Sequence, residues 1–150
     1  MLGLIESTGN RQSSGGGTSP SSTPSRSTAP RRRRVLIVED NIDAGRSLAY
    51  FLRDVGHQVE HAINGYAAIA IARNLRPDIV FLDLGLPGMD GFTVAREIKR
   101  EPGLEKVRIV VVTGYGQDEY RERALKSGCD MHLIKPVDPK TLASLIDFPA

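Results

Sequence analysis

Cysteine and long hydrophobic runs are scarce in this 150-residue chain, and each scarcity excludes a class of protein. The single cysteine, Cys129, excludes an internal disulfide framework and a cysteine-based zinc site, and we expect it to be a small buried side chain. No apolar run approaches the roughly 18–20 residues that span a bilayer, so we expect no transmembrane segment. Residues 1–6 lack the basic stretch that begins a secretory signal, and we therefore expect a cytoplasmic protein.

Charge is distributed unevenly along the chain. Residues 1–34 hold six arginines and one acid, a net charge of +5, whereas residues 35–150 carry a net charge of −3. From Ser7 to Pro30 the sequence is almost entirely Ser, Thr, Gly and Pro, which cannot bury enough apolar surface to offset the entropy of ordering it. We predict a disordered tail with a basic run over residues 1–33 and one folded domain over residues 34–150.

The basic run Arg31–Arg34 is open to two interpretations. A block of like charge is usually a solvated boundary between a tail and a folded domain. The alternative is an electrostatic contact with an acidic partner, with nucleic acid or with anionic lipid. Because the folded part is mildly acidic and no aromatic side chain is interleaved with the arginines, we expect no direct binding to DNA.

Short apolar segments alternate with helical patterns from residue 34 onwards. Apolar runs rich in Val and Ile are typical of strands buried on both faces of a parallel sheet; the predicted strands are residues 35–38, 58–62 (a weaker, alternating segment), 79–82, 107–112 and 131–134. Apolar residues spaced three and four apart predict helices at residues 48–55, 68–75, 92–100, 118–127 and 138–146. Five strand–helix repeats predict a three-layer α/β fold with parallel strands and right-handed crossovers.

Chemically active side chains follow the predicted strands. Glu39 and Asp40 follow the first, Asp83 the third, Thr113 the fourth and Lys135 the fifth. The carboxyl ends of parallel strands share one edge of a sheet, so we expect these side chains to meet in one pocket. Three carboxylates in one pocket repel each other, so either a cation is bound or one of them takes a proton, and an all-oxygen ligand set suits Mg²⁺. A hydroxyl and a lysine beside them predict a site for phosphoryl transfer onto a carboxylate.

Four motifs, each at a predicted strand end, resemble those of the response-regulator receiver domain of two-component signalling, the chemotaxis-regulator-like phosphoacceptor module. The motifs are residues 35–41 (VLIVEDN), 83–91 (DLGLPGMDG), 112–114 (VTG) and 134–136 (IKP). The resemblance covers about residues 34–147. It implies a flavodoxin-like three-layer sandwich with a five-stranded parallel sheet of order 2-1-3-4-5 and five helices.

The resemblance also implies a role for each matching residue. Asp83 is expected to accept the phosphoryl group from a phosphohistidine of a histidine kinase or a histidine phosphotransfer protein. Mg²⁺ is expected to be bound by Asp40, by Asp83 and by the backbone carbonyl of Gly85, with Glu39 acting through a water molecule. Thr113 and Lys135 are expected to contact the phosphoryl group, and the Lys135–Pro136 peptide bond is expected to be cis.

The family's switch lies three residues before the lysine. That position holds His132, where tyrosine or phenylalanine is commoner, so the residue is either the switch or a half-buried strand histidine. Phosphorylation is expected to change an output face built from residues 118–127, 131–134 and 138–146. This face would bind a downstream protein or form a homodimer. The domain is not expected to be an enzyme beyond assisting its own phosphorylation and dephosphorylation.

Other functions stay open at the level of the sequence. The fold can serve as a phosphate-independent pseudo-receiver interaction module, or as the receiver segment of a hybrid histidine kinase. A haloacid-dehalogenase-like phosphotransferase is disfavoured because such enzymes usually carry an Asp-x-Asp pair and residue 85 is Gly. A nucleotide or flavin site is disfavoured because no glycine-rich loop follows the first strand. His57 and His61 lack metal-ligand spacing, and we interpret them as surface polar residues.

Overall fold

The computed structural model describes residues 32–114, 122–123 and 126–147. Of the predicted tail, only residues 32 and 33 belong to the described part of the chain, and residues 1–31 lie outside it. The same holds for most of the predicted helix 118–127, of which residues 122, 123 and 126 are described and helical.

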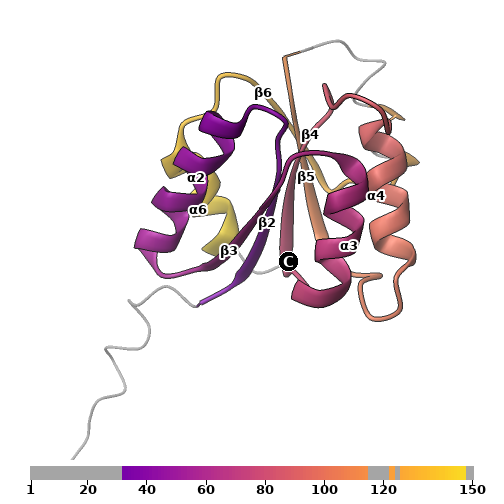
Figure 1. Ribbon diagram of the computed structural model, residues 1–150, viewed down its shortest axis with the longest axis horizontal. Coiled ribbons are helices and arrows are strands. Elements are labelled where there is room, and N and C mark those ends of the chain that lie inside the picture. Colours follow the sequence, from indigo (N-terminus) through magenta and orange to yellow (C-terminus); the bar gives the residue numbers. More distant parts are fainter. Residues whose placement is uncertain (1–31, 115–121, 124–125, 148–150) are drawn as a thin grey trace, which may run out of the picture. The chain divides into compact units, whose positions relative to one another are not determined.

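The five predicted strands form a single parallel sheet (Figure 1). Its order is β3-β2-β4-β5-β6, which in chain order is the expected 2-1-3-4-5. All five residues of the central strand are buried, as its continuous apolar sequence predicts. The bounds of the strands are β2 Arg34–Val38, β3 Gln58–Ala62, β4 Ile79–Asp83, β5 Arg108–Thr113 and β6 Met131–Ile134.

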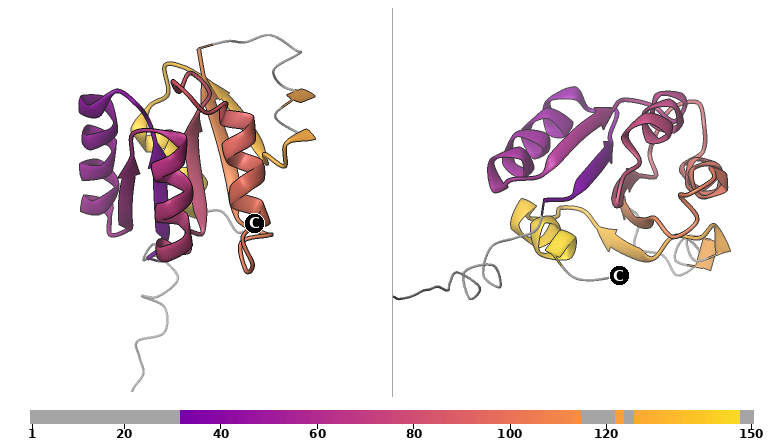
Figure 2. Two further views of the ribbon diagram at one scale, coloured as in Figure 1. Left: turned by 45° about the vertical axis from the view of Figure 1, so that its right-hand side comes forward. Right: turned by 90° about the horizontal axis from the view of Figure 1, so that it is seen from below.

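Helices cover both faces of the sheet, which gives the expected three layers (Figures 1 and 2). Helices α2 and α6 lie on one face, and α3 and α4 lie on the other. Their bounds are α2 Ile42–Val55, α3 Gly65–Leu75, α4 Gly91–Arg100 and α6 Pro139–Asp147. These four correspond to four of the five predicted helices.

Short polar side chains fix where the helices begin. Asn41, Asn64, Asp90 and Asp138 each accept a hydrogen bond from a backbone N–H of the helix that follows. Helix α2 begins six residues before the predicted residue 48, because residues 42–44 are exposed and show no apolar periodicity. The cap at Asn41 therefore places the amino end of α2 directly after the two acids that follow β2.

Each face of the sheet has its own hydrophobic core, because successive residues of a strand point to opposite faces. Val35 and Ile37 of β2 pack with α2 and α6, whereas Leu36 and Val38 pack with α3 and α4. Cys129 belongs to the second core and is 4% exposed, as predicted. Its burial, together with the charge of Asp130, raises the pKa of its thiol to about 12, so the thiol stays protonated.

Candidate functional site

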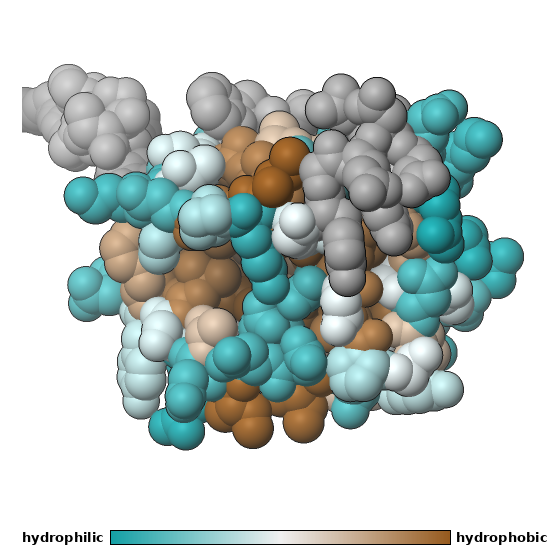
Figure 3. Space-filling view, turned by 90° about the horizontal axis from the view of Figure 1, so that it is seen from above, coloured by the Kyte–Doolittle hydropathy of each residue, from teal (hydrophilic) through white to brown (hydrophobic). Residues whose placement is uncertain are grey.

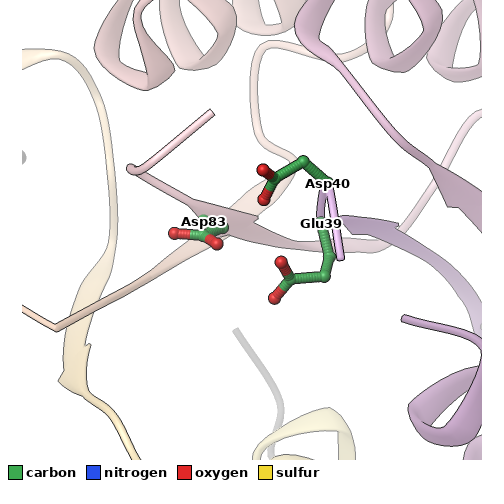
Figure 4. Close-up of side chains that lie close together, drawn as sticks. All are labelled: Glu39, Asp40 and Asp83. Atoms are coloured by element: carbon green, nitrogen blue, oxygen red, sulfur yellow. The ribbon is translucent and has the colours of Figure 1, made fainter. Parts of the chain in front are cut away.

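The three predicted carboxylates come together at the carboxyl edge of the sheet. Glu39 and Asp40 follow β2, and Asp83 is the last residue of β4. These two strands are neighbours, with Val38 opposite Leu82. Carboxylate oxygens of the three residues lie within 4.8 Å of one another. Figure 4 shows the side chains of Glu39 and Asp40 pointing toward the side on which Asp83 lies.

Lys135 joins this group from the loop after β6. Its Nζ lies 2.9 Å from Oδ2 of Asp83 and 3.3 Å from Oε1 of Glu39. The peptide bond from Lys135 to Pro136 is cis, as the resemblance implied. Partial burial opposes the charge of the ammonium, but the hydrogen bond and the charge of Asp83, together with Glu39, outweigh it and raise the pKa of Lys135. The lysine therefore remains a cation beside the carboxylates.

Asp83 is held through both of its carboxylate oxygens and is only 8% exposed. Its Oδ1 accepts the backbone N–H of Gly85 at 2.9 Å, and its Oδ2 accepts Lys135. Thr113 ends the neighbouring strand β5 and is also buried. The carbonyl of Thr113 accepts the backbone N–H of Lys135 at 2.8 Å, which fixes the start of the lysine loop.

Glu39 shows the electrostatic strain of this pocket. Its burial, and then the charge of Asp83, raise the pKa of the Glu39 carboxyl. The backbone N–H of Asn41 and the ammonium of Lys135 act in the opposite direction but do not cancel the rise. Asp40 is exposed, and within the described part of the chain its carboxylate makes no hydrogen bond or ion pair. The pocket therefore holds more negative charge than its lysine balances.

The donor set of this pocket fits a magnesium ion. Two ligands of one Mg²⁺ lie at most about 4.2 Å apart, because each bond is about 2.1 Å long. The carboxylate oxygens already lie within 4.8 Å of one another, so small side-chain movements would bring them to one ion. All the donors are oxygens, which this hard cation prefers. A divalent charge would favour the ionised form of Glu39, whose pKa is raised by burial first and by the charge of Asp83 second.

The interpretation of His57 as a surface residue is wrong, and that of His61 is correct only in part. His57 is 4% exposed, and its Nδ1 accepts the backbone N–H of Arg33 at 3.1 Å. His61 is half-buried, and its Nε2 lies 2.8 Å from the carbonyl oxygen of Glu39. The alternation of β3 carried a signal for His61, because this residue shares a face of the strand with the buried Val59.

His132 lies on β6, opposite Val111 of β5. It is half-buried, and its Nε2 is a buried atom with no hydrogen-bond partner among the described residues. His132 therefore lies on the strand next to β5, the strand that ends at Thr113. Most of residues 118–127, the first segment of the predicted output face, lie outside the described residues.

A cleft of about 590 Å³ opens beside the acidic group, between α2 and the segment from Lys135 to α6. Glu39, Asp83 and Lys135 form its polar wall. Apolar side chains that include Leu48 and Val137 form much of the rest. Figure 3 views this edge of the sheet and shows hydrophilic side chains gathered near its middle beside a hydrophobic area. A partner group can therefore reach Asp83 along an apolar wall.

Known proteins share this arrangement. The family model of the response regulator receiver domain matches residues 35–147, and the chain belongs to this family. Protein PilH of Pseudomonas aeruginosa is 33% identical over 114 residues, which are 76% of this chain and 94% of PilH. The chain spans only about half of some other curated relatives that it matches. Among the described residues, no helix is both long and apolar enough to cross a bilayer.

Two solved structures extend the likeness to three dimensions. The chemotaxis protein CheY4 of Vibrio cholerae superposes with a TM-score of 0.73 at 28% identity, covering 77% of this chain and 97% of that protein. A response regulator of Burkholderia pseudomallei, solved with a phosphorylated aspartic acid and a calcium ion, superposes with a TM-score of 0.70 at 25% identity, covering 76% of this chain and 66% of that chain.

The chain is thus a phosphoacceptor receiver domain of two-component signalling. Receiver domains are typically phosphoacceptors rather than enzymes, and they bind Mg²⁺ at an acidic pocket. They interact with histidine kinases or phosphotransfer proteins and with downstream targets. In this chain, Glu39, Asp40 and Asp83 form an acidic group at the carboxyl edge of the sheet.

Proposed function

We propose that Asp83 is the phosphoacceptor and takes its phosphoryl group from a phosphohistidine of a histidine kinase or a histidine phosphotransfer protein. One observation carries the proposal: the carboxylate of Asp83 shares a pocket with those of Glu39 and Asp40 and has the Lys135 ammonium 2.9 Å from its Oδ2. The phosphorylated aspartic acid of the Burkholderia pseudomallei regulator supports the same chemistry on this fold.

Mg²⁺ is the proposed cofactor of the pocket. Asp40 and Asp83 would hold it directly with the backbone carbonyl of Gly85, and Glu39 would contact it through a water molecule. When bound, the ion supplies positive charge that offsets the carboxylates and the oxygens of the phosphoryl group. The donor set supports this assignment, because oxygens of three carboxylates already lie within 4.8 Å of one another.

The transfer itself needs a nucleophile, a charge partner and access for the donor. A carboxylate oxygen of Asp83 forms the bond to phosphorus while the phosphorus–nitrogen bond of the donor histidine breaks, and the released imidazole takes up a proton from water. Lys135 stabilises the negative phosphoryl oxygens as a point charge, and the hydroxyl of Thr113 donates a hydrogen bond to one of them. The donor approaches through the cleft between α2 and the lysine loop.

The proposed output is a change in the face formed by residues 118–127, β6 and α6. Thr113 would move toward the phosphoryl group, and His132 on the adjacent strand would follow it. The altered face would bind a downstream protein or a second copy of the chain. The chain could serve in the same way as the receiver segment of a hybrid histidine kinase, since the site would be the same in a separate receiver and in such a segment. The predicted tail, the receiver boundary at residue 34 and the cytoplasmic location stay predictions from the sequence.

The test is intact-mass measurement after exposure to phosphoramidate with Mg²⁺. We expect the wild-type chain to gain the mass of one phosphoryl group and Asp83→Asn to gain none. Asp54→Asn is the matched control, because this exposed residue of α2 lies away from the pocket and should be labelled like the wild type. Equal labelling of Asp83→Asn would show that another residue is the acceptor, and an unlabelled wild type would indicate a pseudo-receiver.

A further inference from the structure

A second cavity lies at the opposite edge of the sheet from the carboxylates. It has a volume of about 460 Å³ and opens at the amino ends of β2, β4 and β5, where Arg34, Ile79 and Arg108 begin the strands. Strand β4 connects the two sites, because Ile79 lines the cavity and Asp83 ends the same strand four residues later. Four steps of about 3.3 Å separate the sites by about 13 Å.

The lining of this cavity is strongly basic although the folded domain is mildly acidic. Five cationic residues line it, Arg33, Arg34, Arg76, Lys106 and Arg108, whereas its lining holds one acid, Asp78. Two of the arginines belong to the basic run that the proposed function leaves unexplained. The cations come from three separate parts of the chain, so the fold gathers positive charge that the sequence scatters.

The acids at this edge neutralise only part of that charge. Asp78 accepts the backbone N–H of Arg34 at 2.8 Å and lies 3.6 Å from its guanidinium. Glu105, next to the cavity in the chain, accepts the backbone N–H of Gly103 at 3.0 Å. Hydrogen bonds from its own backbone N–H and from that of Gly103 lower the pKa of the Glu105 carboxyl, and the charge of Arg76 helps to lower it, so Glu105 offsets part of the charge of Arg76. The Nε of Arg33 is a buried atom with no hydrogen-bond partner among the described residues. A buried cationic donor without a partner is unfavourable, and a bound anion would compensate for it.

Arg76 lines the cavity and has an unusual backbone conformation. It follows α3 with a φ of 55°, in the left-handed region that glycine adopts at lower free energy. Its guanidinium donates to the carbonyl of Pro102 and lies over Gly103, where a Cβ would overlap it. A glycine would suit the backbone better, so what the arginine adds at this position is its side chain at the cavity.

We propose that this cavity binds a small organic molecule that carries several phosphate-type negative charges. The volume falls in the range of about 300–1,000 Å³ that is usual for small-molecule sites. Arginine is the side chain best suited to phosphate, because its planar fork donates two parallel hydrogen bonds. The buried aliphatic residues Leu104 and Val107 also line the cavity and would contact an apolar part of such a molecule.

A nucleic acid fits the cavity less well than a small anion. Aromatic side chains, on which single-stranded bases stack, do not occur among the residues that line it. The basic residues surround a hollow, whereas binding to a duplex needs cations displayed along a helix or strand that enters a groove or follows the phosphates. We therefore infer a ligand that is small enough to enter the cavity. The experiment below also tests whether nucleic acid binds better.

The experiment uses ATP as the probe, added to the full chain in EDTA so that no divalent ion carries it to the carboxylates. By calorimetry at physiological ionic strength we expect ATP to bind, tripolyphosphate to bind more weakly and adenosine not to bind. Arg76→Gln and Lys106→Gln should each weaken ATP binding about tenfold or more. The control Arg46→Gln, an exposed position on α2, should leave the affinity unchanged. ATP should shift the backbone amide resonances of Ile79 and Leu104.

Several results would overturn the proposal. Absence of binding by both ATP and tripolyphosphate would mean that the cavity is no anion site. Equal weakening by Arg46→Gln and Arg76→Gln would show diffuse attraction to a charged surface. Displacement of ATP by a short DNA duplex at lower concentration than tripolyphosphate requires would identify nucleic acid as the better ligand. The Asp83→Asn variant should bind ATP like the wild type, so this outcome is independent of phosphorylation.

Discussion

At the scale of single residues, Lys135 and Asp40 have opposite relations to a cation in the pocket. The Nζ of Lys135 contacts Asp83 and Glu39, so its positive charge would compete with a divalent ion for these carboxylates. Asp40 is exposed and contributes negative charge without a protein partner in the described part of the chain. The two residues can therefore be separated by their effects on metal affinity.

We predict that Asp40→Ala weakens Mg²⁺ binding at least tenfold, because it removes a charged oxygen ligand. Lys135→Ala should leave the affinity unchanged or higher, because a competing positive charge is removed. The same lysine variant should lose the response of its amide resonances to phosphoramidate. Calorimetric titration with MgCl₂ measures the first effect and NMR spectra the second. A loss of affinity in Lys135→Ala as large as in Asp40→Ala would contradict this division of roles.

The sequence was sufficient to predict that the side chains at the strand ends lie close together, but not what surrounds them. Asp83 and Lys135 could be predicted to meet because strand ends of a parallel sheet share an edge, which holds whatever the loops do. The hydrogen bond from His61 to the carbonyl of Glu39 could not be predicted, since it depends on the register between β3 and β2. The burial of His57 depends on residues 24 positions away.

At the scale of elements, the packing of α2 on β3 depends on one glycine. Gly45 lies in the first half of α2, and a Cβ at this position would overlap the imidazole of His61. The same imidazole holds the carbonyl of Glu39, so the helix, the strand and the acidic turn meet at one contact. A glycine inside a helix is otherwise unfavourable by up to about 1 kcal/mol relative to alanine.

We predict that Gly45→Ala lowers the free energy of unfolding by about 1–3 kcal/mol, because the imidazole is forced from its site. In a His61→Ala background the same change should be neutral or stabilising, since the overlap is gone and alanine favours the helix. Urea unfolding of the two single variants and the double variant measures this coupling. Gly114→Ala is the control, because no atom of the described residues, its chain neighbours apart, lies within 4 Å of its added Cβ. Additive effects in the cycle would rule out the contact.

Element boundaries show what the apolar pattern can and cannot predict. The strands were found within one or two residues because both faces of each central strand are buried. The start of α2 was placed too late, since residues 42–44 beside the acidic pocket are exposed and show no apolar periodicity. Helix ends that lie at a functional edge thus give weak sequence signals, and the cap at Asn41 was the usable one.

At the scale of the whole molecule, the parallel sheet separates two edges of opposite charge. Carboxylates gather at the carboxyl ends of the strands and arginines at the amino ends. The two charged edges are separated by the length of one strand, and β4 extends from the arginine edge to the carboxylate edge. Because strands of a parallel sheet all run the same way, charges that follow or precede strands in the sequence are collected at opposite edges of the fold.

His57 links the stability of the whole domain to pH near the amino edge. Burial, opposed by the charge of Asp147 and aided by that of Arg33, lowers the pKa of His57. Its Nδ1 accepts the Arg33 N–H, so the neutral ring carries its proton on Nε2. The folded state therefore holds this histidine neutral, whereas the unfolded chain takes up a proton near pH 6.5, at the ordinary pKa of histidine.

We predict that His57 makes the free energy of unfolding fall as the pH drops below about 6.5, because protons then favour the unfolded chain. The contribution is fully present above that pH and is lost progressively as the pH falls toward the lowered pKa of the folded state. His57→Asn keeps an acceptor for Arg33 and cannot titrate, so its stability should fall less between about pH 7 and about pH 5. Urea unfolding at each pH measures the difference between the two proteins, which cancels the contributions of the carboxylates. Parallel pH profiles of the free energy of unfolding would show that His57 is not the group responsible. A wild-type free energy that rises toward low pH relative to that of the variant would show that the pKa of His57 is raised in the folded state, not lowered.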